Sequence, residues 1–307
     1  MELSKSCKEY WGFSPFLTPF GTHVEKAEAL FLWPKFEAVV ERMVNAVEKR
    51  RFLLVAGAAC SSKSTAWREA QMRLREKHVI IHIAEPVGLD PWAYDEQTIY
   101  RTVHRAMALG GQSDEGLGSD KERREVALKR SREERALQCR RLLERANDAG
   151  QPTCLAVNDV HKCRRSFLFL AKRLWDDLYG FDRLLSVILV GQPDVVTAVT
   201  DIPEISERTE VVTMPGLGEA LDDYLAFECR RCGLAAVPFD AGAVDAIKKL
   251  NTTNWTNTRD HPLVVANVAS RALHEAWRVK LRAVDSDIVA KALRVEKALG
   301  IQEPAKK

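Results

Sequence analysis

The sequence lacks any hydrophobic run long enough to cross a membrane. No apolar stretch in its 307 residues reaches the roughly 18 residues that a membrane-spanning helix needs. The opening residues, Met1–Cys7, also lack the apolar core of a secretory signal. We therefore expect a cytoplasmic protein that makes no use of a membrane.

Cysteine is scarce, and its spacing disfavours most cysteine-based architectures. The seven cysteines are odd in number and irregularly spaced, which is typical of reduced thiols rather than of a disulfide framework. One close pair, Cys229 and Cys232, has the spacing of half a zinc site, but a structural zinc ion needs four ligands and no second close pair exists. The residues before Gly233 have the pattern of an amphipathic helix, so we interpret the pair as thiols on that helix.

A strong excess of one charge is missing as well. The formal net charge is +3, which is too small to indicate a nucleic-acid partner by itself. Apolar residues make up 46% of the chain and charged residues 29%, a balance typical of globular proteins. The length allows one large domain and a smaller one.

The most informative segment that is present is Val55–Thr65, where an apolar strand runs into small residues and then Lys-Ser-Thr. Walker A loops have a glycine, four variable residues, a second glycine, and then Lys followed by Ser or Thr. Gly57, Lys63 and Ser64 occupy their places, and Ser62 stands where the second glycine belongs. The apolar run before the loop and the helix-forming residues after it supply the required context. The alternative is an ordinary strand-turn-helix with a chance Lys-Ser-Thr.

The loop residues have separate roles in holding ATP and Mg²⁺. Backbone N–H groups of such a loop and the dipole of the following helix hold a polyphosphate, while Lys63 reaches the outer phosphates. The hydroxyl of Ser64 is an oxygen ligand for Mg²⁺. A side chain at position 62 costs roughly 1 kcal/mol if the site demands a left-handed backbone. The residues expected to bind the nucleotide are Gly57, Cys60, Ser61, Ser62, Lys63, Ser64 and Thr65.

Short apolar runs alternate with helical patterns through the first two thirds of the chain. The runs begin at Phe52, Val79, Cys154 and Leu184, and they are typical of strands buried on both faces of a parallel sheet. The sequence therefore predicts a doubly wound α/β domain, followed from about Gly218 by helices alone. We expect an N-terminal segment with its helix over 1–50, an α/β core over 51–217 with a basic insertion at about 113–147, a helical lid over 218–299 and a flexible tail over 300–307.

The segment from Lys121 to Arg145 is crowded with basic residues. One interpretation is a helix that faces nucleic-acid phosphates. The other is a solvated helix with Glu–Arg pairs three and four residues apart, and composition does not separate the two. On the first interpretation, the residues that would contact nucleic acid are Arg123, Arg124, Lys129, Arg130 and Arg132.

Nucleotide hydrolysis needs further groups at the ends of neighbouring strands. A carboxylate that holds Mg²⁺ and a second acid that orients water are expected after a buried strand, and Asn158-Asp159 is the candidate pair. Either Asn158 takes the metal position and Asp159 the base position, or Asp159 itself serves the metal. Both registers predict weak hydrolysis. Gln192 follows the next strand and can sense the γ-phosphate or position water, and Arg208 can act on a neighbour's nucleotide as an arginine finger.

The order of these segments resembles the AAA+ ATPases of the ExeA type, which include the TniB and TnsC-like transposition ATPases and function like the phage Mu B protein. The residues that carry the resemblance lie in four segments, namely 10–16 (Tyr-Trp-Gly-Phe-Ser-Pro-Phe), 190–194 (Val-Gly-Gln-Pro-Asp), 205–208 (Ile-Ser-Glu-Arg) and 239–247 (Phe to Ile). The resemblance spans most of the chain and implies an AAA+ P-loop NTPase with a parallel sheet core and a C-terminal helical lid subdomain.

The chain also departs from the family pattern at three places. The glycine-rich loop is thinned by Cys60 and Ser62, and the acidic motif Asp-Glu-Ala-His becomes Asn-Asp-Val-His over 158–161. The lid motif Gly-x-Pro-Arg becomes Asp-His-Pro-Leu over 260–263, which removes the sensor-two arginine, although Arg259 lies nearby. The resemblance thus implies ATP binding and assembly more strongly than brisk hydrolysis.

The resemblance favours the transposition branch, because secretion-type members carry a membrane span and a cell-wall-binding extension that this sequence lacks. It implies a protein that binds ATP at subunit interfaces, assembles into a ring or helical filament on duplex DNA in a sequence-tolerant way, and delivers that DNA to a transposase. Two alternatives remain open: a secretion-associated ATPase, and a nucleotide-dependent scaffold without turnover.

Overall fold

A computed structural model describes residues 2–21, 29–78, 80–86, 90–108, 127–249 and 260–298. The chain divides into two compact units. We call Glu37–Gly57 with Lys63–Met214 the sheet unit, and Met1–Phe36 with Ala58–Ser62 and Pro215–Lys307 the helical unit. The limit expected at 217/218 lies just after the passage between the units at 214/215, whereas the limit expected at 50/51 falls inside the sheet unit. The tail expected over 300–307 lies outside the described residues.

The sheet unit is built on five parallel strands, as the alternating pattern predicts. Three of them, β1, β3 and β6, are buried at every residue, so their apolar side chains fill both faces of the sheet. The order across the sheet is β2-β3-β6-β1-β7. The strands are β1 Phe52–Ala56, β2 His82–Ala84, β3 Thr153–Val157, β6 Ser186–Gly191 and β7 Thr209–Thr213. The predicted α/β class with a parallel core is confirmed.

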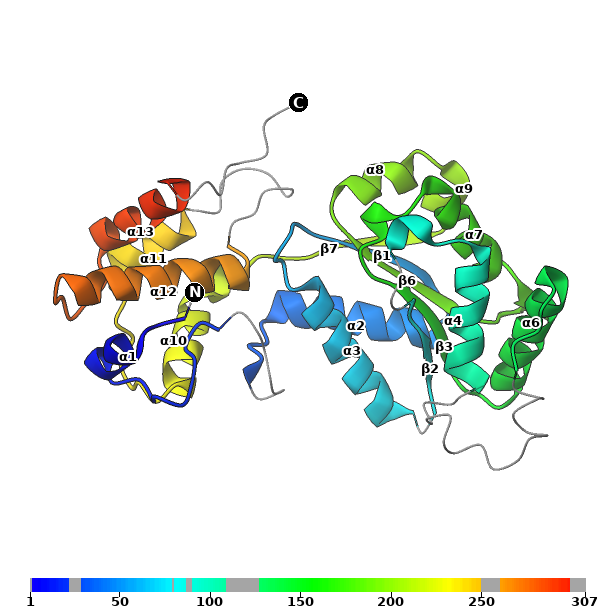
Figure 1. Ribbon diagram of the computed structural model, residues 1–307, viewed down its shortest axis with the longest axis horizontal. Coiled ribbons are helices and arrows are strands. Elements are labelled where there is room, and N and C mark those ends of the chain that lie inside the picture. The colour runs from blue at the N-terminus through cyan, green and yellow to red at the C-terminus, as the bar shows by residue number, and fades with distance from the viewer. Residues whose placement is uncertain are drawn as a thin grey trace. The chain divides into compact units, whose positions relative to one another are not determined.

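Helices cover the sheet on both sides, with α2 and α3 on one side and α4, α6 and α7 on the other (Figure 1). Alternate residues of each strand face each layer, and those of one face, such as Phe52, Leu155 and Leu189, share one core with the second group of helices. The helices are α2 Pro34–Glu48, which starts in the helical unit, α3 Lys63–Lys77, α4 Glu96–Ala108, α6 Arg132–Asp148, α7 Arg165–Trp175, α8 Asp194–Thr200 and α9 Pro203–Ser206. Two 3₁₀ turns, η2 Pro91–Ala93 and η4 Val160–Lys162, and a small hairpin of β4 Leu178–Tyr179 and β5 Asp182–Arg183 complete the unit.

The helical unit has the lid-like run of helices expected near the C-terminus, and the N-terminal segment packs on it. The indole Nε1–H of Trp11 donates to the carbonyl of Leu273 at 3.1 Å. The backbone N–H of Phe20 donates to the buried carboxylate of Glu228 at 2.8 Å. The elements are α1 Lys5–Trp11, η5 Gly218–Ala220, α10 Leu221–Arg231, α11 Ala241–Lys248, α12 Pro262–Arg278 and α13 Ser286–Ala298. No described helix is both long and apolar enough to cross a membrane.

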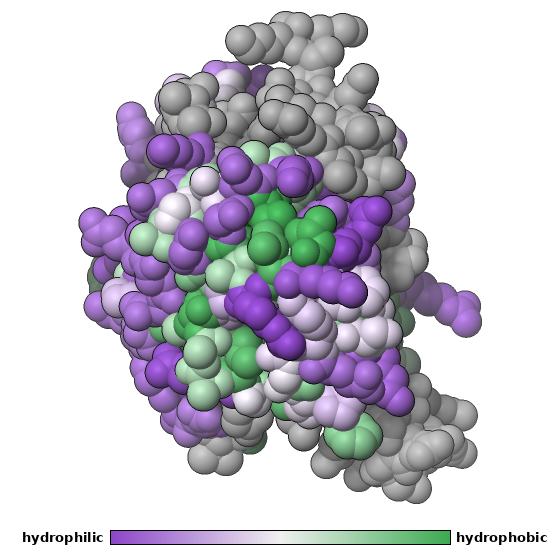
Figure 2. All heavy atoms as spheres, turned by 90° about the vertical axis from the view of Figure 1, so that its left-hand side faces the viewer, coloured by the Kyte–Doolittle hydropathy of each residue, from purple (hydrophilic) through white to green (hydrophobic). Residues whose placement is uncertain are grey.

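Apolar side chains also reach the surface of the helical unit. Figure 2 shows the face that carries its helices, where apolar residues gather among hydrophilic ones. The large apolar side chains exposed on the described part of this unit are Phe16, Leu17, Leu32, Val237, Val279 and Leu281.

The cysteine pair lies where the helical pattern placed it. Helix α10 ends at Arg231, and Gly233 follows with a φ of 89°, a left-handed conformation that glycine adopts without strain. Cys229 and Cys232 are free and buried. Burial raises the pKa of the Cys229 thiol to about 12 and that of Cys232 to about 11, so both stay protonated.

Candidate nucleotide-binding site

The backbone of the candidate phosphate loop is left-handed at two positions that are not glycine. Cys60 has a φ of 66° and Ser62 a φ of 63°. Ser62 is the position where the Walker A pattern has its second glycine, so the structure has the backbone that a glycine would adopt without strain. The chain keeps the shape of the loop at a cost of roughly 1 kcal/mol for each side chain. Other turns of this chain also have a positive φ without glycine, at Arg50 and Lys280 for example. The phosphate-loop interpretation is therefore favoured by this backbone together with the Walker A spacing that ends in Lys63.

Lys63 begins helix α3, and its ammonium group returns to the strand side of the loop. Its Nζ donates to the carbonyl oxygen of Gly57 at 2.8 Å. Gly57 is fixed in turn, because its N–H donates to the carbonyl of Gly191 at 3.1 Å. The lysine is therefore held at the carboxyl end of β1, where a phosphate group would exchange with the carbonyl as its partner. Ser64 is exposed in the first turn of the same helix, with its hydroxyl available to a metal ion.

The candidate pair of Asn158, an amide, and Asp159, an acid, comes directly after β3, and both residues are exposed. Asp159 has a φ of 54°, and its carboxylate accepts a hydrogen bond from Nζ of Lys162 at 2.9 Å. That hydrogen bond and the charge of Asp159 raise the pKa of Lys162, which therefore carries its positive charge at neutral pH. The single carboxylate of the Asn-Asp pair, that of Asp159, is thus already bound to Lys162. This arrangement agrees with weak hydrolysis.

Gln192 follows β6, on the strand that lies between β3 and β1. Its backbone N–H donates to Nδ1 of His161 at 3.4 Å, which ties the turn after β6 to the turn after β3. Gly191 allows this close approach, because an added Cβ would lie 2.9 Å from Val160 Cγ1 and 3.0 Å from Val195 Cγ1. Because the strands are parallel, the turns after β1, β3 and β6 meet at one edge, where open α/β sheets bind their ligands.

A further acid at this edge, Glu85, was missed from the sequence. It follows β2, the strand that pairs with β3. Its carboxylate accepts hydrogen bonds from Nε1 of Trp67 and, at 2.9 Å, from Nε2 of Gln71, and both donors lie on α3. The signal was a short apolar run that ends in an acid, His82–Glu85, the same pattern used to find Asp159. Glu85 thus connects the helix that follows the phosphate loop to the edge strand.

The candidate arginine finger, Arg208, lies between α9 and β7 and is half exposed. Its guanidinium binds the carboxylate of Asp176 at 3.0 Å, and Asp176 also binds Lys172 at 2.6 Å and Arg183 at 3.3 Å. Partial burial would raise the pKa of Asp176, but the hydrogen bond from Lys172 and the three cations together lower it. An exposed ion pair of this kind contributes about 0–1 kcal/mol, so a neighbour's phosphate can compete for Arg208.

The described part of the basic segment separates its residues into two groups. Arg132 begins α6 and forms an ion pair with Glu96, and Arg135 and Arg140 also bind groups of the chain itself. Lys129 and Arg130 are exposed, and neither has an acidic partner among the described residues. The Glu–Arg interpretation therefore applies to the helix, while the nucleic-acid interpretation stays open for Lys129 and Arg130. Arg123 and Arg124 lie outside the described residues.

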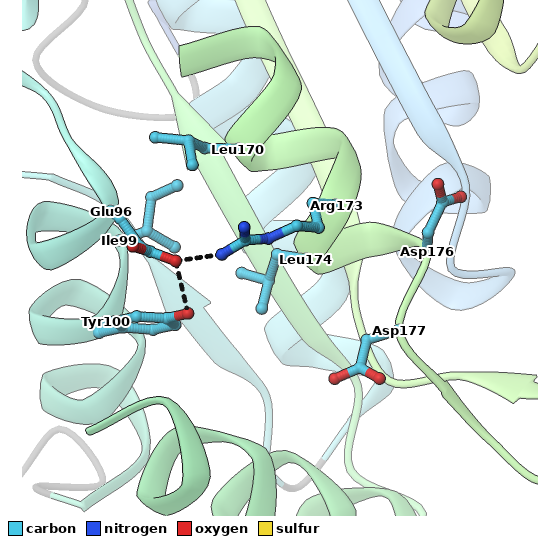
Figure 3. Close-up of a pocket in the computed structure, with 8 residues that line it drawn as sticks. All are labelled: Glu96, Ile99, Tyr100, Leu170, Arg173, Leu174, Asp176 and Asp177. Carbon is cyan, nitrogen blue, oxygen red and sulfur yellow. Dashed lines mark hydrogen bonds and ion pairs between the residues drawn. The ribbon is translucent and has the colours of Figure 1, made fainter. Parts of the chain in front are cut away.

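Arg132 reaches a polar cluster that lines a pocket of about 330 Å³ between α4 and α7. In Figure 3 the carboxylate of Glu96 lies between the hydroxyl of Tyr100 and the guanidinium of Arg173. Burial would raise the pKa of Glu96, but these hydrogen bonds and the charges of Arg132 and Arg173 lower it. The pocket belongs to the packing of α4 against α7 and is not formed by the strand ends described above.

In the helical unit, the residue that replaces the lid-motif glycine has a structural role. The buried carboxylate of Asp260 accepts the N–H of Gly218 at 2.8 Å. It also fills the space beside Gly216, where an added Cβ would lie 1.9 Å from Oδ1. The acid therefore fixes the segment that starts this part of the unit. Arg259, the candidate replacement for the sensor-two arginine, lies outside the described residues.

Comparison with known proteins finds similarity in structure but not in sequence. No protein-family model matches the chain, and no curated protein sequence does. Among solved structures, Cdc6p from Pyrobaculum aerophilum is 13% identical with a TM-score of 0.57, and the match covers 98% of this chain and 76% of that one. The Aeropyrum pernix ORC1 protein in complex with DNA is 15% identical with a TM-score of 0.52, over 89% of this chain and 68% of that one.

A third solved structure gives the same result. The Aeropyrum pernix ORC2 protein, described as ADPNP-ADP complexes, is 12% identical with a TM-score of 0.52, over 91% of this chain and 73% of that one. At such low identity the comparison speaks for the fold alone. The parallel sheet, the loop between β1 and α3 and these likenesses together show that the chain has the fold of the AAA+ P-loop ATPases.

Proposed function

We propose that this chain is an ATP-dependent DNA-binding AAA+ protein that assembles on duplex DNA and delivers target DNA to a transposase, with slow ATP hydrolysis. The observation that carries the proposal is the left-handed backbone of the phosphate loop at Cys60 and Ser62. This backbone, followed by Lys63 at the Walker A spacing, supports a loop whose N–H groups bind a phosphate.

The residues at the loop fit ATP with Mg²⁺. Lys63 supplies a positive charge for the outer phosphates, and Ser64 supplies a hydroxyl oxygen for the metal. Bound Mg²⁺ would neutralise phosphate charge. Thr65, Ser61 and the loop N–H groups complete the expected contacts. Either Asn158 faces the metal and Asp159 is the base, or Asp159 itself faces the metal.

Slow turnover follows from the acids that the chain does not have. An amide at Asn158 leaves an oxygen ligand but removes a negative charge, and Asp159 is shared with Lys162. Lys162 donates to the carboxylate that would have to accept a proton from water, so the two compete for the same oxygen atoms. Gln192 can orient water but cannot accept its proton at neutral pH. We therefore expect ATP binding and assembly to be retained although hydrolysis is slow.

ATP favours assembly if a neighbouring subunit completes its site. A ligand that contacts two subunits stabilises the pair by its differential affinity for the assembled state. Arg208 is the residue proposed to reach the neighbour's nucleotide, at the loss of its ion pair with Asp176. One structural neighbour is described in complex with DNA and another with nucleotide, and both descriptions support a DNA-associated, nucleotide-binding role here.

Duplex DNA is the proposed partner of the exposed cations Lys129 and Arg130 and of their basic neighbours. Contacts to phosphates position a protein without reading bases, so binding should tolerate any sequence. With about five phosphates contacted, log affinity should fall against log salt with a slope of roughly −4 to −5.

The test is Lys63→Ala, compared with wild type in calorimetry with Mg-ATP and in electron microscopy with duplex DNA and a slowly hydrolysed ATP analogue. The variant should lose measurable nucleotide binding and form no rings or filaments, because the phosphate charge has no partner. Arg75→Ala, an exposed cation at the other end of the same helix, is the matched control and should behave as wild type. Normal assembly of Lys63→Ala would refute the site.

A further inference from the structure

The hairpin of β4 and β5 carries an unusual concentration of exposed apolar side chains. Its two-residue turn is Gly180-Phe181, and Gly180 has a φ of 63°, as the first turn position of a tight hairpin favours. Phe181 at the tip is fully exposed, and Leu178 and Tyr179 are more than 40% exposed. Burying such side chains gains about 25 cal/mol per Å² of apolar area, so a tip left wholly in solvent indicates a surface that another molecule covers.

The base of the hairpin is fixed by Trp175 and by two arginines. The guanidinium of Arg183 stacks on the Trp175 ring at 3.4 Å from its centroid and donates to the Trp175 carbonyl at 3.0 Å. Arg140 of α6 donates to the carbonyl of Leu178 at 3.2 Å and binds Asp177 at 2.6 Å. These contacts fix the backbone that carries Phe181, so little conformational freedom is lost when its ring contacts a ligand.

Cations without acidic partners lie next to this tip. A hollow of about 380 Å³ separates the hairpin from the Lys49–Arg51 run that precedes β1. Arg51 binds Glu210, but Lys49 and Arg50 have no acidic partner among the described residues. Glu48, which also lines the hollow, is compensated by Lys77 at 3.4 Å. Asp182 of β5 is a second acid that lines the hollow, and it offsets one of these two cations. Lys49 and Arg50 together still leave the hollow with a positive charge, which attracts an anion.

We propose that this surface contacts duplex DNA, with Lys49 and Arg50 on backbone phosphates and Phe181 against the bases. An apolar acidic peptide also suits a positive hollow beside an aromatic ring. DNA is favoured because the two features are those of a nucleic-acid strand, negative charge along the backbone and flat apolar bases beside it. Arg140 also joins the hairpin to α6, the helix that follows Lys129 and Arg130.

The proposal rests on the proposed function, but it concerns a different edge of the sheet. Arg51 directly precedes β1 and the hairpin precedes β6, so the hollow lies at the amino ends of strands whose carboxyl ends carry the phosphate loop and Gln192. A substitution at the hairpin should therefore leave nucleotide binding unchanged while it weakens DNA binding.

The experiment measures duplex affinity of Phe181→Ala in the presence of the ATP analogue over a range of salt concentrations. We expect about tenfold weaker binding with an unchanged salt slope, because the substitution removes stacking and leaves the charge as it is. The matched control is Phe16→Ala, which removes a side chain that is 94% exposed in the helical unit and should change nothing.

The cations are tested with Lys49→Gln combined with Arg50→Asn, since asparagine tolerates the φ of 50° at position 50. The salt slope should become shallower by about 2, because each phosphate that the protein no longer neutralises lowers the slope by roughly 0.9. A duplex that carries 2-aminopurine should brighten on binding wild type and not on binding Phe181→Ala, because an aromatic side chain against the bases disturbs their stacking.

The outcomes separate this proposal from the one on which it rests. Wild type without any duplex affinity would overturn the proposed function. If wild type binds duplex DNA and Phe181→Ala binds it with the same affinity, only the role of the hairpin is overturned. The hairpin's role in binding DNA would also be overturned if Phe181→Ala bound duplex DNA as wild type does but no longer bound an acidic peptide. Mg-ATP affinity and the thermal midpoint must match wild type for a loss of DNA binding to count as support.

Discussion

The turns after β1 and β3 lie at the same edge of one sheet but carry different parts of the candidate nucleotide site. The turn after β1 keeps its lysine, its hydroxyl and a left-handed backbone, even though Cys60 and Ser62 make that backbone strained. The turn after β3 has Asn158 in place of one carboxylate, and Lys162 holds the other. If the proposed function is correct, this difference predicts that the chain binds a nucleotide more readily than it hydrolyses one.

The largest expected effect tests whether Asp159 is the remaining catalytic acid. Asp159→Asn should lower the residual hydrolysis rate by about 100-fold, because a positioned general base contributes roughly 10²–10⁴ in rate. Mg-ATP affinity should change by less than about threefold, since the amide keeps an oxygen ligand. Single-turnover phosphate release measures the rate. If the variant hydrolyses at the wild-type rate, the turn after β3 has no catalytic role and the comparison fails.

The reverse change should partly restore the acidity that the turn after β3 lacks. Asn158→Asp adds the carboxylate that hydrolytic relatives have and should raise the turnover rate by about tenfold, because developing charge and Mg²⁺ are better compensated. Steady-state assays with and without duplex DNA measure the turnover rate. The control is Asp194→Asn on α8, which changes the net charge by the same amount in the opposite direction. A turnover rate unchanged by the new acid would show that Asn158 does not face the metal.

The turn after β1 can be improved rather than broken. Ser62→Gly removes a side chain from a residue with a φ of 63°, and relief of roughly 1 kcal/mol predicts about fivefold tighter Mg-ATP binding if the strain arises when the loop becomes ordered. Lys280→Gly relieves the same kind of residue, with a φ of 58°, in the helical unit. It should stabilise the fold but leave ATP affinity unchanged. Equal affinities for both variants would mean that the loop is not the binding site.

The smallest expected effect concerns the stability of the sheet unit, to which both turns belong. Glu96 has a lowered pKa, so its ionised form stabilises the sheet unit above its unfolded pKa of about 4.3, and that stability is lost as the pH falls through the lower folded value. Wild type should therefore lose more resistance to urea between pH 7 and pH 3 than Glu96→Gln does. Glu76→Gln, on the exposed side of α3, should follow wild type. Parallel pH profiles for all three proteins would contradict the cluster's role.

Sequence reasoning could identify the buried strands because their signal is local. The runs at β1, β3 and β6 are apolar at nearly every residue, and the loop after β1 carries a motif of fixed spacing. Strand β7 was missed because Thr209–Thr213 lies at an edge, where only Val212 is buried, so its pattern resembles a polar loop. The β4–β5 hairpin was missed because two-residue strands give no periodic signal.

The partners of the candidate site residues could not be predicted, since they come from distant parts of the chain. Arg132 and Glu96 are 36 positions apart, and Arg208 and Asp176 are 32 positions apart. Composition could therefore not decide whether the basic segment binds DNA or pairs with acids. Arg132 meets Glu96 only because α6 packs beside α4 in the folded chain. Glu85 had a local signal, but its hydrogen bonds with Trp67 and Gln71 depend on how α3 packs beside β2.

The absence of a side chain at Gly191 has a consequence for how such a site can change over time. A methyl group there would press on Val160 and Val195, and Val160 is the immediate neighbour of Asp159 in the chain. Any larger residue at 191 would shift the carboxylate as well as the strand that bears it. Substitutions at Asn158 and Lys162, whose side chains reach solvent, can therefore alter this edge of the sheet without steric cost, whereas any side chain at position 191 displaces its neighbours.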